Sequence, residues 1–129
     1  MGSEGEEKIR DVYNRACTHH LPDKVDIHLN WAAFEEQRGQ VENARTILEK
    51  CEEKHPHLMS VLLRRINLER RSGNNEAVHS LYKSCIAKAK NANSRVELGI
   101  KYGRYLRLVL FFISRIFVQN CDMEHIDFA

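Results

Sequence analysis

Four residues near the N-terminus have side chains that bind zinc or form a thiol–imidazole pair: Cys17, His19, His20 and His28. Zinc sites take their ligands from short pairs such as Cys-x2-Cys with His-x3-His, because such pairs reach a tetrahedron from short loops. No such pairing occurs here, and a nucleophilic cysteine would need an activated thiolate in a pocket, which no motif here indicates. A Cys/His hydrolase or metal site is the least favoured interpretation, and we expect no enzyme activity, metal or cofactor.

The spacing of the cysteines indicates a packing role instead. Cys17, Cys51 and Cys85 recur at a constant interval of about 34 residues, a period typical of stacked helical repeats. Each lies at the end of an apolar stripe with i, i+3, i+4, i+7 spacing, which marks one face of an amphipathic helix. We expect the repeat core to consist of Tyr13, Cys17, Trp31, Phe34, Ala44, Leu48, Cys51, Ile66, Leu68, Leu81, Tyr82 and Cys85.

The helices that carry these stripes are bounded by glycine and polar turns. Gly39 and Gly73 are separated by the same interval as the cysteines, and glycine closes a helix C-terminus in the left-handed conformation at no steric cost. Ser94 with Glu97 matches a capping box at the start of a last helix. No run alternates as a strand would, so we predict an all-α fold of antiparallel helix pairs. The expected helices span about 6–19, 26–38, 41–53, 58–72, 75–90 and 95–106.

The C-terminal sequence departs from this pattern. We expect a repeat array over 1–106 and a divergent tail over 107–129, apolar at first and then polar and structureless from Cys121. The apolar run 106–118 has about 13 residues and contains two arginines, whereas a bilayer span needs roughly 20 apolar residues. We therefore expect no membrane partner. Residues 108–118 are a candidate surface for a dimer or another partner, and equally a candidate aggregation site.

Composition and charge fit a single soluble domain. Among 129 residues, 43% are hydrophobic and 29% charged, which is ordinary for a foldable chain. A formal net charge of +2 does not by itself indicate a nucleic-acid or membrane partner. The first seven residues are small and acidic and do not resemble a signal peptide, so we expect a reducing cytosol or nucleus, without disulfides.

The densest basic patch is formed by Arg64, Arg65, Arg70 and Arg71. Arginine forks match phosphate and carboxylate oxygens, so this face could contact an acidic partner or RNA. The alternative is a solvated helix face, on which Glu69 would pair with Arg65 at i, i+4 spacing and use part of the charge.

The units resemble a known repeat. The segments 31–36 (Trp-Ala-Ala-Phe-Glu-Glu) and 44–50 (Ala-Arg-Thr-Ile-Leu-Glu-Lys), on either side of a Gly turn, are similar to the half-a-tetratricopeptide (HAT) motif of RNA-processing scaffolds. The segments 12–18, 20–22, 31–37, 63–65 and 68–71 resemble the pre-mRNA-processing factor 39 family specifically. The resemblance covers about 9–106. Arg65 stands where the repeat alignment has its Trp, and the run after Leu106 does not continue the pattern, as in a fragment or truncated form.

The resemblance implies a right-handed α-solenoid and a non-enzymatic scaffold in the nucleus. Members of the family act with the U1 snRNP in 5′ splice-site recognition, so the implied partners are spliceosomal proteins, with homo- or heterodimers formed through HAT repeats. Direct RNA contact is compatible with this role but not required. The alternative is a generic tetratricopeptide-like adaptor that binds a peptide outside splicing, although tetratricopeptide repeats lack the Trp-x2-Phe-Glu block of residues 31–35.

Overall fold

The chain folds entirely into helices over the residues that the structure describes. The computed structural model describes the backbone of residues 2–128 and the side chains of residues 4–119, and no strand occurs over this range. The all-α prediction is confirmed. The elements are α1 (Gly2–Arg15), a π-helical turn (Ala16–His20), α2 (Val25–Gln37), α3 (Val41–Lys54), α4 (Met59–Arg71), α5 (Asn75–Lys88) and α6 (Ala92–Phe128).

The chain divides into two compact units, Met1–Lys88 and Ala89–Ala129, called here the N-terminal and C-terminal units. The sequence pattern predicts the division later, after residue 106. The structural division coincides with the link between α5 and α6. The N-terminal unit therefore contains α1 to α5 and the C-terminal unit consists of α6.

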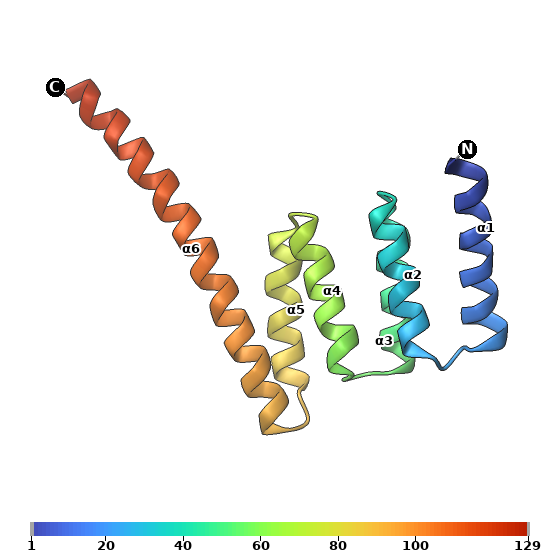
Figure 1. Cartoon of the computed structure of the whole chain (residues 1–129). Coiled ribbons are helices and arrows are strands. Elements are labelled where there is room, and N and C mark those ends of the chain that lie inside the picture. The colour runs from blue at the N-terminus through green and yellow to red at the C-terminus, as the bar shows by residue number, and fades with distance from the viewer. Residues whose placement is uncertain (1, 129) are drawn as a thin grey trace. The chain divides into compact units, whose positions relative to one another are not determined.

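Antiparallel helix pairs make up most of the N-terminal unit. Helices α2 and α3 form one pair and α4 and α5 the next, with α1 preceding them (Figure 1). A core forms where α2, α3 and α4 meet, with Val25, Trp31 and Val41 packed on its edge. The buried residues of this core are Leu29, Ala32, Ala44, Ile47, Leu48, Cys51, Val61 and Leu68. Helices α2, α3 and α4 thus bury apolar side chains against one another, and burial of such side chains is the main driving force for packing. On α1, by contrast, Ile9 and Val12 of the predicted apolar stripe are exposed.

The turns inside the pairs are Schellman motifs built on the two glycines. Gly39 and Gly73 both have φ of +79°, the left-handed conformation in which a side chain would be strained. In the first turn, the Gln40 N–H donates to the Glu35 carbonyl (2.8 Å) and the Gly39 N–H donates to the Glu36 carbonyl (3.0 Å). The predicted role of both glycines is confirmed.

Helix α1 contacts α2 through an aromatic pair as well as through ion pairs. The rings of Tyr13 and Phe34 lie 5.8 Å apart between centroids, and the Arg38 guanidinium lies 5.5 Å from the Phe34 ring centre. Both geometries fall within the ranges in which aromatic pairs and cation–π contacts are favourable. Phe34 therefore contacts both α1 and the end of its own helix.

Helix α6 corrects two expectations. It begins at Ala92 and continues to Phe128, whereas the sequence predicted a helix over 95–106 and a structureless end. No Gly or Pro follows Gly103, so no residue of the tail interrupts helical hydrogen bonding. The predicted capping box at Ser94 is also wrong: the Asn91 side-chain oxygen accepts from the Ser94 N–H (2.7 Å), so the cap lies three residues earlier.

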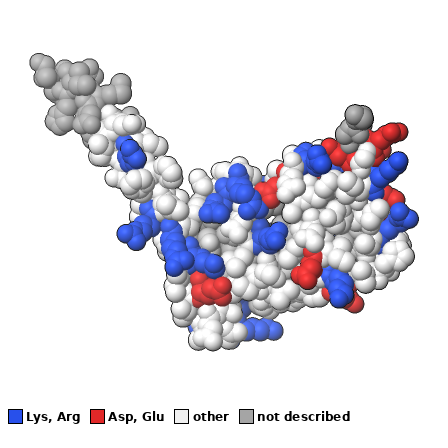
Figure 2. Space-filling view, in the orientation of Figure 1, with Lys and Arg blue, Asp and Glu red and all other residues white. Residues whose placement is uncertain are grey.

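The apolar run of α6 is exposed. Between Leu108 and Val118, large hydrophobic side chains on all sides of the helix are 52–67% exposed. Figure 2 shows acidic and basic side chains mixed over the N-terminal unit, while the described end of the chain is mostly uncharged. No helix within the described residues is both long and apolar enough to cross a membrane.

Candidate functional site

A buried glutamate at the end of α2 connects three helices. The Glu35 side chain is 1% exposed and accepts hydrogen bonds from Arg10 Nε of α1 at 2.6 Å and from Arg10 Nη2 at 3.3 Å. Asn43 Nδ2 of α3 donates to the same carboxylate at 3.1 Å. Because the Glu35 carbonyl also accepts the Schellman bond of the following turn, one residue fixes both the turn and the position of α1.

The next repeat contains the same arrangement. Glu69 lies one repeat period after Glu35, is 5% exposed and receives both Nε and Nη2 of Arg45 from α3, the latter at 3.0 Å. Asn74 Nδ2 donates to this carboxylate at 3.1 Å, and the Asn74 N–H donates to the Glu69 carbonyl at 3.0 Å. In each repeat, then, a buried glutamate binds an arginine of the preceding helix and closes its own turn. We call each of these two arrangements a glutamate staple.

The electrostatics of the staples favour the charged forms. Burial alone would raise the pKa of Glu35, but the hydrogen bonds from Arg10 and Asn43 outweigh burial and hold that pKa below its ordinary value of 4.5. The Glu69 carboxylate likewise raises the pKa of Arg45 above its already high ordinary value. Charge-assisted hydrogen bonds of this kind are stronger than neutral ones, so the two pairs orient successive helices.

The residues predicted as repeat core lie on the inward faces of their helices. Tyr13, Trp31, Phe34 and Leu81 are half-buried. The other eight are buried, with exposed fractions of 8% or less, and they are Cys17, Ala44, Leu48, Cys51, Ile66, Leu68, Tyr82 and Cys85. Burial raises the pKa of the thiols of Cys17, Cys51 and Cys85, so these thiols are held in the unreactive, protonated form.

The four residues that could have formed a zinc or thiol site are not arranged as one. Cys17 and His28 are buried, and His28 Nε2 lies 2.9 Å from the Pro22 carbonyl oxygen, while His19 and His20 are exposed. Within the described part of the chain, no three potential ligands among His, Cys, Asp and Glu cluster closely enough to hold a metal ion.

The four arginines of the predicted partner face are not equivalent. Arg65 pairs with Glu52 and lies 3.6 Å from Glu49, both on α3, and Arg71 forms a two-pronged ion pair with Glu36 of α2 at 2.7 and 2.8 Å. The expected pairing of Arg65 with Glu69 is wrong, because Glu69 is occupied by Arg45. Arg64 and Arg70 are exposed and form no ion pair with any described residue. These two arginines are the ones available to a partner.

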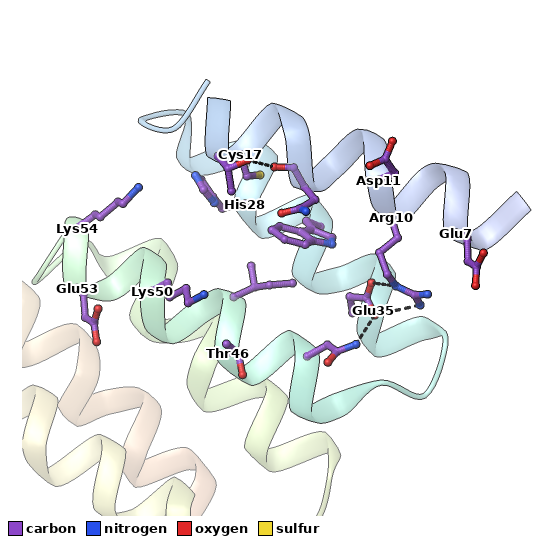
Figure 3. A pocket seen from close by; sticks show the side chains of 15 residues that line it. Glu7, Arg10, Asp11, Cys17, His28, Glu35, Thr46, Lys50, Glu53 and Lys54 are labelled. Atoms are coloured by element: carbon purple, nitrogen blue, oxygen red, sulfur yellow. Dashed lines mark hydrogen bonds and ion pairs between the residues drawn. The ribbon is translucent and has the colours of Figure 1, made fainter. Parts of the chain in front are cut away.

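A groove that the sequence did not reveal runs between α1 and α3. It has a volume of about 970 Å³, and side chains of α1, the π-helical turn, α2 and α3 line it. Trp31 and Ile47 contribute apolar surface, and Lys50 extends from α3 into the open space (Figure 3). The only sequence signal for the groove is that its polar residues lie on the sides of α1 and α3 opposite their apolar stripes.

Comparisons of the sequence with known proteins point to one family. The family model for the PRP39 C-terminal HAT repeat matches residues 1–71. Proteins called pre-mRNA-processing factor 39 are similar to this chain: the human protein is 46% identical over 100 residues, the mouse protein 47% over 100, and the Xenopus laevis protein 44% over 106. These matches cover 78–82% of this chain.

The chain spans only 15–16% of the length of those relatives. The matched residues 1–71 nevertheless contain the first helix pair, the Gly39 turn and the arginine–glutamate pairs of both staples. The chain therefore belongs to the PRP39 C-terminal HAT repeat family.

Proposed function

We propose that the chain is a non-enzymatic scaffold of pre-mRNA splicing that acts in the nucleus, with the U1 snRNP, in 5′ splice-site recognition. The observation that carries this proposal is family membership over residues 1–71, together with 44–47% identity to proteins named pre-mRNA-processing factor 39. The association with the U1 snRNP and with the 5′ splice site is inferred from the resemblance of the repeat motifs to this family.

The structure supports a mechanical role. Helix pairs held by two glutamate staples present exposed side chains at fixed spacing, and a preorganised surface binds a partner with little loss of conformational freedom. On α4, Arg64 and Arg70 offer unpaired guanidinium groups that match the carboxylates of an acidic protein segment. The same array can pair with a second HAT array as a homo- or heterodimer, and none of these contacts requires RNA.

The test is recovery of U1 snRNP proteins from nuclear extract by the tagged 129-residue chain, with and without Arg64→Glu/Arg70→Glu. We expect the unsubstituted chain to recover U1 proteins and the charge-reversed variant to lose them, since glutamates in place of the two arginines would repel the carboxylates of an acidic partner. Lys24→Glu/Lys83→Glu is the matched control, because it changes the net charge equally at two other exposed positions.

Four outcomes would alter the proposal. Equal recovery by the Arg64→Glu/Arg70→Glu variant would remove α4 as the docking face but leave the scaffold role. Absence of all U1 proteins would contradict the association with that particle, and recovery of proteins unrelated to splicing would favour the peptide-binding adaptor instead. Solution mass by light scattering decides the oligomeric state, and a strict monomer would contradict pairing through the array.

A further inference from the structure

The groove between α1 and α3 carries two lysines that the fold does not use. Lys50 and Lys54 are both exposed, line the groove, and form no ion pair with any residue whose side chain is described. Being four residues apart on one helix, they lie on the same face of α3, about 6 Å apart along the axis. They form a pair of free positive charges along one wall of the groove.

These lysines stand beside apolar surface. Trp31 is half-buried and Ile47 is 7% exposed, and both line the groove. Lys54 lies close enough to Cys17 and Cys51 to lower the pKa of both thiols, although burial raises it more. A bound segment that reached the lysines would therefore also cover apolar surface, and this combination gives both affinity and register.

The remaining charges of the groove decide between a peptide and a nucleic acid. Arg10 is occupied by Glu35, and Asp11 is paired with Arg15 at 3.1 Å, so neither offers a free charge. Glu7 and Glu53 also line the groove without a described ion-pair partner. In Figure 3 the side chain of Glu53 points in another direction from α3 than the side chains of Lys50 and Lys54. A nucleic-acid strand carries a negative charge at every nucleotide and would be repelled by these carboxylates, whereas a peptide can place acidic residues only where the lysines are.

We propose that this groove binds an acidic amphipathic segment of a partner protein, with two carboxylates about 6 Å apart on Lys50 and Lys54 and an apolar side chain on Trp31 and Ile47. A carboxylate pair of that spacing occurs at i, i+4 on a helix or i, i+2 on an extended strand. The inference deepens the proposed scaffold function by naming a second docking site, separate from Arg64 and Arg70, and the chemistry that it recognises.

The experiment is a selection of random 16-residue peptides on the full 129-residue chain, followed by fluorescence anisotropy with the enriched peptides. We expect the enriched peptides to carry an acidic pair at i, i+2 or i, i+4 next to an apolar residue. Their dissociation constants should rise about tenfold or more on Lys50→Glu/Lys54→Glu, because two attractive contacts become repulsive. Lys24→Glu/Lys83→Glu, which makes the same change of net charge outside the groove, should leave binding within about twofold.

Thermal melts by circular dichroism accompany both variants. Since Lys50 and Lys54 are exposed and unpaired, both variants should melt like the natural chain. The inference is overturned if no peptide is enriched, if the enriched peptides lack the acidic pair, or if they bind the Lys50→Glu/Lys54→Glu variant equally well.

A separate arm uses a 20-nucleotide oligouridylate. If it binds the chain and is lost with Lys50→Glu/Lys54→Glu while no peptide is selected, the groove is a nucleic-acid site and the peptide proposal fails. Recovery of U1 proteins from nuclear extract is scored independently with the unsubstituted chain. If U1 proteins are recovered but the peptide selection fails, only the groove proposal is contradicted. If the selection succeeds but no U1 protein is recovered, only the splicing assignment is contradicted.

Discussion

Replacing Arg10 by methionine should destabilise the N-terminal unit by about 2 kcal/mol. The Glu35 carboxylate is 1% exposed in the unsubstituted chain, and the change leaves Asn43 as its remaining described donor outside α2. Removing one partner of a fully buried ion pair costs about 3–5 kcal/mol. Arg10 is 34% exposed, however, so water reaches the vacated space, and one of its two hydrogen bonds is long at 3.3 Å. Both facts bring the expected loss below that range.

The assay is urea unfolding followed by circular dichroism at pH 7, with Arg15→Met as the matched control. Arg15 forms an ion pair with Asp11 on the same helix, but the two side chains are 59% and 60% exposed. Exposed i, i+4 pairs on a helix contribute about 0.3–0.5 kcal/mol, so the control should lose no more than about 0.5 kcal/mol. In a Glu35→Gln background, Arg10→Met should cost about half as much, because the buried charge is gone.

The pH dependence gives an independent check. The pKa of Glu35 is lower in the folded chain than its ordinary value of 4.5, so its stabilising contribution is present above that pH and is lost as the pH falls through the lower folded value. In the Arg10→Met variant, burial is no longer offset by the guanidinium, so the folded pKa rises and the carboxylate can take up a proton. The difference in unfolding free energy between the two proteins should therefore shrink below about pH 4.5. A loss no larger than that of the Arg15→Met control, or one that does not change with pH, would refute the staple argument.

Two further results are expected. Gly39→Ala should lower the free energy of unfolding in urea by about 1–2 kcal/mol, because φ is +79° and alanine is strained there, although nothing lies within 4 Å of the added methyl. Gly39→Asn should cost less, since asparagine adopts the left-handed conformation more readily. Equal costs would show that backbone strain is not the cause. Cys17 and Cys51, both 2% exposed and with pKa values raised by burial, should react with Ellman's reagent at pH 8 only as fast as the unit opens, and fast labelling of the folded chain would contradict their burial.

The repeat architecture could be read from the sequence because its signals are local. A constant period in cysteine and glycine locates helix pairs and turns, and both depend on residues close together in the chain. The bounds of α2 to α5 accordingly fall within two residues of those expected. The extent of α6 was missed, because the loss of an apolar stripe removes the evidence for packing without removing the ability to form a helix.

The glutamate staples were harder to foresee. Glu35 and Glu69 stand out only by their spacing, and a charged residue is normally expected on the surface. Their burial depends on arginines 25 and 24 residues earlier, which only the packing of neighbouring helices brings into reach. The same applies to Arg65, for which helical spacing suggested Glu69 while the structure supplies Glu52 from another helix. The groove depends on the separation of α1 from α3, which no residue pattern encodes.

The staples also bear on how the chain reaches its folded state. They join residues 25 and 24 positions apart, and the pairs of Arg65 with Glu52 and Arg71 with Glu36 join residues 13 and 35 apart. Closing a loop between residues so near in the chain costs little conformational entropy, and proteins dominated by such contacts fold fast. During synthesis, each arginine–glutamate pair can close once the two helices that carry it and the glycine turn that follows them have left the ribosome, without waiting for the C-terminal end. The array should therefore assemble progressively from its N-terminus, one repeat at a time.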